Sequence, residues 1–167
     1  HKSDIINEFS FKNKIKCNEE YLHDIINSNS VSLCFRSDRY NERFEDDKDT
    51  IKLKKTKLFE EAQYNYILRA VNYFEHNLTN PKFHLFSDNF TKLDKYFLSN
   101  KFYLIKDYIN DKVVEDFLLM TNCKHYAVAP TSFHWWAAWL NQNENKICLR
   151  PKDINPSNNS DFWPESW

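Results

Sequence analysis

The sequence of 167 residues contains no glycine at all, although average usage of about 7% would give roughly a dozen. This absence excludes the glycine-rich phosphate loops, namely the GxGxxG motif of dinucleotide sites and the Walker A motif. Any phosphate site in this chain must therefore be built from the N-termini of helices and from side chains.

Several other features are missing as well. No stretch approaches the ~20 apolar residues that span a membrane, and no signal peptide is visible. The four cysteines form no CxxC pair, so we expect neither a zinc site nor a redox motif, but free thiols in a reducing cytoplasm. The formal net charge is −1, which gives no support to nucleic acid as a partner.

Apolar residues make up 41% of the chain. Along the sequence, segments with the spacing of strands take turns with segments that have the spacing of helices. Patterns typical of strands occur at Ser30–Arg36, Phe83–Phe86, Phe102–Ile105, His125–Ala129 and Lys146–Leu149. Helical spacing occurs at Leu58–Leu78, Phe90–Leu98, Val113–Thr121 and Ser132–Leu140, and the charged segment Asn41–Thr56 is expected to be a loop. This alternation predicts an α/β fold with a parallel sheet and helices on both faces.

Sites in such sheets lie at the carboxyl ends of the strands. Three segments occupy such places here: Arg36, the pair Ser87-Asp88, and Pro130–Phe133. A guanidinium at the first place can hold a diphosphate through two hydrogen bonds and stabilise charge on a departing nucleotide. The alternative for Arg36 is a surface ion pair with Asp38, which this stretch alone favours.

The other two strand ends also allow two interpretations each. The carboxylate of Asp88 can accept hydrogen bonds from the edge of a guanine, or Asp88 or Asn89 can cap the next helix. The hydroxyls of Thr131 and Ser132, with the free N–H groups of the helix that starts there, can form an anion site. The alternative is an ordinary helix cap.

Further polar residues are weaker candidates for chemistry. His125 and His134 could transfer protons, but neither has a partner that the sequence identifies, and we expect both to be structural. Glu115 and Asp116 are adjacent in a predicted helix and face different directions, so they do not form the carboxylate pair of a glycosidase. Asp116 either stays exposed or positions a loop at a strand end.

Three stretches resemble the C-terminal half of the α-1,2-fucosyltransferase family, glycosyltransferase family 11. The most specific one follows the order and spacing of the family motif with Glu115-Asp116, Leu119-Met120, Cys123-Lys124-His125 and Ser132–Leu140. The stretches Phe86-Ser87-Asp88 and Lys146–Lys152 continue the likeness. The family's strand motif His-x-Arg-x-Gly-Asp-Tyr is altered, because the corresponding residues here are Cys34, Arg36, Asp38, Arg39 and Tyr40.

The resemblance implies an inverting glycosyltransferase of the GT-B type, with this chain as its Rossmann-like C-terminal domain. The donor would be GDP-fucose, the acceptor a galactosyl glycan, and neither a metal nor another cofactor would be needed. By position, Arg36 would be the catalytic residue that holds the pyrophosphate and assists the departure of GDP. Asp88 would read the guanine, and the remaining donor-binding candidates are Tyr40, Ser87, Thr131, Ser132 and Phe133.

The resemblance also implies a division of the chain. We expect a partial N-terminal or linker segment at residues 1–29, a donor-binding domain at 30–154 and a tail at 155–167. Apart from the resemblance, the aromatic residues Phe162, Trp163 and Trp167 indicate that the tail docks on some surface. The family's N-terminal half would come from a missing domain or a partner chain, and the protein could associate with the inner face of the membrane. The alternatives are an inactive pseudo-transferase that binds a glycan or a partner, and a transferase that uses another GDP- or UDP-sugar.

Overall fold

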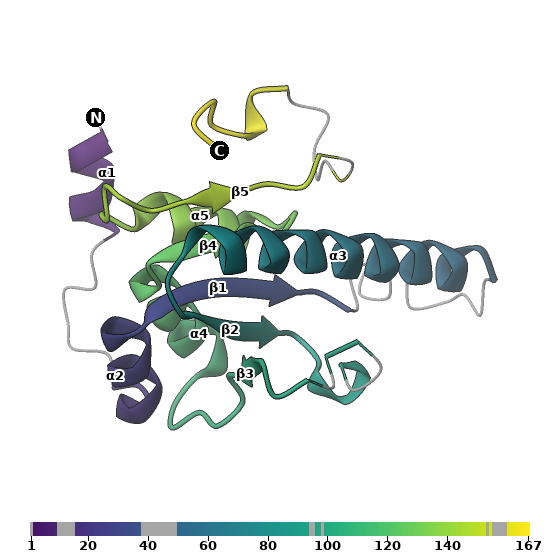
Figure 1. Cartoon of the computed structure of the whole chain (residues 1–167), viewed down its shortest axis with the longest axis horizontal. Helices are drawn as coiled ribbons and strands as arrows, with labels where there is room; N and C mark the ends of the chain where they lie inside the picture. Colours follow the sequence, from purple (N-terminus) through teal and green to yellow (C-terminus); the bar gives the residue numbers. More distant parts are fainter. Residues whose placement is uncertain are drawn as a thin grey trace.

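One five-stranded sheet organises the chain (Figure 1). The computed structural model describes residues 2–9, 16–37, 50–93, 96–97, 99–152, 154 and 160–167. The strands are β1 (Asn29–Phe35), β2 (Pro81–Ser87), β3 (Phe102–Leu104), β4 (His125–Ala127) and β5 (Cys148–Leu149). They are arranged in the order β3-β2-β1-β4-β5, and each neighbouring pair is parallel. The predicted α/β class with a parallel sheet is confirmed.

Helices cover both faces of this sheet, as predicted. The helices are α1 (Lys2–Glu8), α2 (Glu19–Asn27), α3 (Thr50–Asn77), α4 (Lys112–Asn122) and α5 (Ser132–Leu140), with short 3-10 turns η1 (Phe90–Lys92) and η2 (Ser160–Phe162). The long helix α3 packs on one face, while α2, α4 and α5 pack on the other. The two apolar clusters between these layers and the sheet hold the domain together.

Alternation along the strands supplies both clusters. In β1, Val31, Leu33 and Phe35 are fully buried and pack with Ile67 of α3. Residues of the opposite face, such as Tyr126 of β4, pack with α2, α4 and α5. Each fully buried side chain of this size contributes roughly 1.5–3 kcal/mol relative to exposure. The period of two in the sequence therefore determines which cluster each strand residue joins.

Two expectations about the elements are wrong. The segment Asn41–Thr56 is not a loop throughout, because α3 already begins at Thr50; residues 41–49 lie outside the described part. Its lysines are good helix formers, and Thr56 and Phe59 are buried against the fold, so the first turns become part of α3. The segment Phe90–Leu98 holds only the turn η1 in its described residues, because Leu93 and Phe97 enter the core through a tight turn.

The chain makes its turns without glycine. Among the described residues, Asn80 alone has a positive φ, of 49°. It lies between α3 and β2, where the chain reverses direction. Asparagine tolerates the left-handed conformation better than most residues, because its short polar side chain can hydrogen-bond locally. Pro81 follows and begins β2, four residues after the end of α3.

The two ends of the chain pack on the same side of the sheet. Ile25 of α2 is fully buried among residues of α4 and α5. In the tail, Trp163 is buried, and Trp135 Nε1 of α5 donates a hydrogen bond to the carbonyl of Phe162 (2.8 Å). The aromatic tail therefore docks as predicted, while the division at residues 1–29, 30–154 and 155–167 stays a prediction.

The packing of α3 leads to a first prediction. Ile67→Ala should lower the free energy of unfolding by about 2–5 kcal/mol, because it opens a cavity beneath α3. Its neighbour Leu68 is 40% exposed, so Leu68→Ala should cost less than about 1 kcal/mol. Denaturant unfolding of both variants measures the difference. Equal losses would contradict the assignment of Ile67 to the core.

Candidate functional site

The order of the strands creates a switch point in the sheet. From β1 the chain continues outward through β2 and β3, and then crosses over to β4 and β5 on the other side of β1. Ligands of open parallel sheets bind where such a change of direction separates the carboxyl ends of adjacent strands. A cavity of about 380 Å³ lies at this place, and its lining includes Arg36, Ser87, Asp88, Thr131 and Phe133.

The structure thus brings together the three strand ends that the sequence singled out. One candidate does not line the cavity, and another cannot be placed. Ser132 is exposed and is not part of the lining, and Tyr40 lies outside the described residues. Asp38, the alternative partner of Arg36, also lies outside them.

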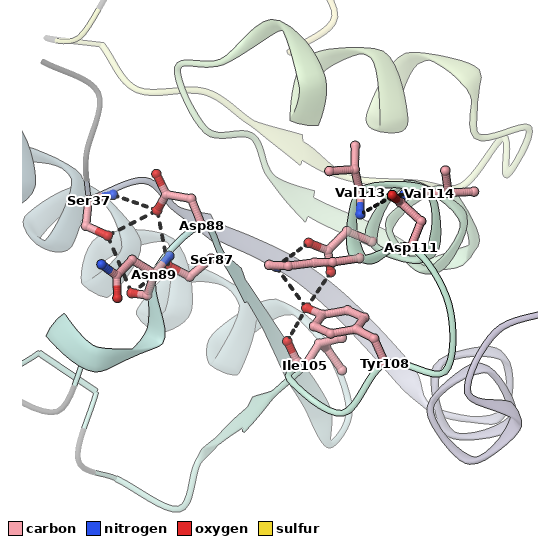
Figure 2. A network of polar contacts seen from close by, with 11 residues as sticks. Ser37, Ser87, Asp88, Asn89, Ile105, Tyr108, Asp111, Val113 and Val114 are labelled. Atoms are coloured by element: carbon pink, nitrogen blue, oxygen red, sulfur yellow. Dashed lines mark hydrogen bonds and ion pairs between the residues drawn. The ribbon is translucent and has the colours of Figure 1, made fainter. Parts of the chain in front are cut away.

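Asp88 links the ends of β1 and β2 (Figure 2). Its Oδ1 accepts hydrogen bonds from the backbone N–H (2.9 Å) and the hydroxyl (3.0 Å) of Ser37. Its Oδ2 lies 3.7 Å from Nε of Arg36, and the two side chains are 28% and 33% exposed. Gln63 of α3 binds both backbone groups of Arg36, at 3.2 Å and 2.8 Å. Asp88 therefore pairs with the Arg36 guanidinium, and Gln63 fixes the backbone that carries it.

For Asp88, helix capping was the alternative to guanine binding, and this capping role belongs to the next residue, Asn89. Oδ1 of Asn89 accepts a hydrogen bond from the N–H of Thr91 (3.0 Å) and caps η1. The carboxylate of Asp88 therefore does not cap η1 and instead joins the ends of β1 and β2.

The start of α5 presents backbone donors at the same place. Thr131 is its N-cap, and Oγ1 of Thr131 accepts a hydrogen bond from the N–H of His134 (3.3 Å). The preceding N–H groups of Ser132 and Phe133 have no partner within the part of the chain that the structure describes. The ordinary cap is therefore present, whereas the anion site stays a prediction, to which the N–H groups of Ser132 and Phe133 are suited.

Two further charged residues line the cavity, and the sequence analysis did not assign them to the site. Nζ of Lys112 lies 2.7 Å from Oδ2 of Asp116, one helical turn further along α4. The hydroxyl of Tyr108 lies 2.7 Å from Oδ1 of Asp116 and 2.5 Å from the carbonyl of Ile105 (Figure 2). The i,i+4 spacing of Lys112 and Asp116 was the signal that could have identified this pair.

Asp116 is buried, so the alternative that it stays exposed is wrong. Burial raises its pKa, although the hydrogen bonds from Lys112 and Tyr108 act in the opposite direction. Glu115 is also buried but has different partners: its carboxylate accepts from the N–H groups of Ile109 (2.9 Å) and Asn18 (3.1 Å). Glu115 thus joins the loop before α4 to the start of α2, and the two carboxylates do not act as a pair.

Both histidine candidates are structural. Nδ1 of His134 accepts a hydrogen bond from the N–H of Ala129 (2.9 Å), so Nε2 carries the proton and donates to the hydroxyl of Ser32 (2.8 Å). Burial lowers the pKa of His134 to about 3. Nδ1 of His125 accepts from the N–H of Ile147 (3.1 Å), and burial lowers its pKa as well.

The described residues contain no group of three or more His, Cys, Asp or Glu side chains that could hold a metal ion. In the same part of the chain, no helix is long and apolar enough to cross a membrane. All four cysteines are free thiols, and three of them are buried. The fourth, Cys34, lines the cavity, and burial raises its pKa to about 12.

Comparison with known proteins gives one family. Residues 49–163 match glycosyl transferase family 11. The chain is 30% identical to an alpha-1,2-colitosyltransferase of Escherichia coli, over 92% of this chain and 52% of that protein. It is 29% identical to the O-antigen biosynthesis glycosyltransferase WbnK of Escherichia coli, over 62% of this chain and 35% of that protein. The chain thus spans about half or less of these relatives, and no solved structure matches it significantly.

The environment of His134 predicts how stability depends on pH. The neutral form is favoured in the folded chain, whereas the unfolded chain takes up a proton near pH 6.5. Stability from this group is therefore complete above pH 6.5 and declines as the pH falls toward about 3. Between pH 7.5 and pH 5, this one group should lower the free energy of unfolding by about 2 kcal/mol.

The measurement is denaturant unfolding of the wild type and His134→Gln at both pH values. Between pH 7.5 and pH 5, the free energy of unfolding of the variant should fall by about 2 kcal/mol less than that of the wild type. The matched control is His76→Gln, which changes an exposed histidine of α3 rather than a buried one. Parallel curves for the wild type and His134→Gln would contradict the assignment of a neutral His134.

Proposed function

This chain belongs to glycosyl transferase family 11, and from that premise we propose that it is the donor-binding half of an inverting α-1,2-fucosyltransferase. In this proposal fucose passes from GDP-fucose to a galactosyl unit of a glycan, such as a bacterial surface polysaccharide. The observation that carries it is the meeting of Arg36, Asp88 and the start of α5 around one cavity at the switch point of the sheet. Family membership supports the transferase class, and the cavity supports the place of the donor.

Arg36 is proposed to hold the pyrophosphate. Its guanidinium is paired with Asp88 and its backbone is fixed by Gln63, which limits the reorganisation needed when an anion binds. As the acceptor oxygen bonds to the anomeric carbon, the bond from that carbon to GDP breaks and its electron pair leaves with GDP. Arg36 stabilises the charge that develops on the departing phosphate, and the acceptor hydroxyl passes its proton to water.

The N-terminus of α5 is proposed to complete the phosphate site. The N–H groups of Ser132 and Phe133 and the positive end of the helix dipole favour phosphate oxygens. These donors and the guanidinium are proposed to stabilise the phosphate charge together, with no metal ion. This use of a helix start suits a chain that has no glycine for a phosphate loop.

Asp88 is proposed to read the guanine. A carboxylate has about four lone-pair positions, and the contacts of Oδ1 with Ser37 leave Oδ2 on the side of Arg36. Ser87, which lines the cavity, and Tyr40 complete the proposed set of donor contacts.

The acceptor side of the reaction is proposed to come from outside this chain. The chain spans about half of the length of the colitosyltransferase that it resembles. We assign residues 30–154 to the C-terminal donor domain of a GT-B enzyme, which acts in the cytoplasm or at the inner face of the membrane. A further N-terminal domain or a partner chain would then close the cleft over the donor.

A second candidate differs only in the donor sugar. The relative with 30% identity over most of this chain is named an alpha-1,2-colitosyltransferase. A colitosyl donor would use the same nucleotide site, because the contacts described above involve phosphates and base rather than sugar. Pocket shape determines the choice of sugar. Competition binding experiments with GDP-fucose, a colitosyl donor and UDP-sugars show which of these donors the chain prefers.

Nucleotide binding tests the proposal. Isothermal titration of the chain with GDP should show binding, and Arg36→Ala should weaken it by about 1.5–3 kcal/mol, because a charge-assisted hydrogen bond is lost. The control is Arg69→Ala, which removes an exposed arginine of α3 and should not change the affinity. Absence of wild-type binding at millimolar GDP would refute the proposal and favour the inactive pseudo-transferase.

A further inference from the structure

Lys112 occupies an unusual environment at the first position of α4. Its Nζ donates hydrogen bonds to Oδ2 of Asp116 (2.7 Å) and to the hydroxyl of Tyr108 (3.0 Å). It also lies over two aromatic rings, 4.7 Å from the centre of Tyr108 and 5.3 Å from that of Phe90. Contacts of both kinds hold the charge in one position.

The ion pair of Lys112 and Asp116 differs from an ordinary ion pair on a helix surface. The side chain of Asp116 is only 9% exposed, and both residues line the cavity. The ammonium of Lys112 has three N–H bonds, of which two are directed to Asp116 and Tyr108. Its side chain is 35% exposed, so the third N–H can reach a ligand.

The thiol of Cys34 lines the same cavity as these charged groups. Burial raises the pKa of this thiol, and the carboxylates of Asp116 and Asp88 raise it further, whereas Arg36 and Lys112 lower it. The cavity thus contains two cations from different elements, and each is anchored by its own carboxylate.

We propose that Lys112 is a second phosphate-binding residue, so that a nucleoside diphosphate is held between Arg36 and Lys112. Asp116 and Tyr108 are positioning residues that fix Lys112. This inference rests on the proposed function of the same cavity and assigns it a further contact. A diphosphate carries at least two negative charges, which a single guanidinium only partly neutralises.

The network can hold Lys112 in either protonation state of Asp116. Tyr108 can donate to ionised Asp116. When Asp116 is protonated, it donates to the Tyr108 hydroxyl, and Tyr108 donates to the carbonyl of Ile105 instead. Burial already raises the pKa of Asp116.

Binding of GDP and of guanosine to the full chain tests this assignment. Lys112→Met should weaken GDP binding by about tenfold or more and should leave guanosine binding unchanged, because guanosine lacks the phosphates. Lys112→Arg should retain most of the affinity for GDP. The matched control is Lys101→Met, since Lys101 is similarly exposed (42%) and paired with Glu75 (2.7 Å) but lies before β3, at the opposite edge of the sheet. It should bind GDP like the wild type.

Tyr108→Phe tests the positioning role. Removal of the hydroxyl should reduce the affinity for GDP by a smaller factor than Lys112→Met and should not affect guanosine. The relevant quantity is the ratio of the affinity for GDP to the affinity for guanosine, because general damage to the fold would weaken the binding of both ligands alike.

The outcomes separate this inference from the proposed function. If Arg36→Ala weakens GDP binding but Lys112→Met does not, the role of Lys112 is wrong and the donor site stands. If Lys112→Met weakens GDP and guanosine equally, the role in phosphate binding is also overturned. If the wild type does not bind GDP, both the proposed function and this inference are wrong.

Discussion

The contacts of the Asp88 carboxylate determine the geometry of the whole cavity. Asp88 follows β2, and it binds Ser37 and Arg36, which follow the adjacent strand β1. Parallel strands end at the same edge of a sheet, but their loops diverge unless a side chain joins them. Gln63 of α3 adds a second constraint on Arg36. With the strand end fixed from two sides, Arg36 lines the same cavity as the start of α5 at the switch point.

A chain without glycine reaches this arrangement by other means. Glycine-rich loops bring backbone N–H groups close to phosphates, and this sequence cannot form them. Its cavity combines the free end of a helix with two side-chain cations, each of which is paired with a carboxylate. Such pairing holds flexible side chains in position before a ligand arrives, which reduces the entropy lost on binding. These features agree with membership in a family whose members transfer sugars.

Much of the fold and part of the cavity could be predicted from sequence. Strand positions follow from local patterns, and the rule that parallel strands end at one edge places Arg36, Asp88 and Thr131 together. The pair of Lys112 and Asp116 could not be assigned to the site in this way. Its position depends on where α4 crosses the sheet and on the loop that carries Tyr108, and neither has a local signal. The early start of α3 was missed because its charged residues resemble those of a solvated loop.

The most direct test of the account is a crystal structure of the chain with GDP. The account predicts the diphosphate at the switch point, with phosphate oxygens within hydrogen-bond distance of the Arg36 guanidinium and of the N–H groups of Ser132 and Phe133. The guanine should then contact Asp88. A nucleotide bound at another place, for example at the amino ends of the strands, would contradict the account, because Arg36 and α5 would then have no role in holding the donor.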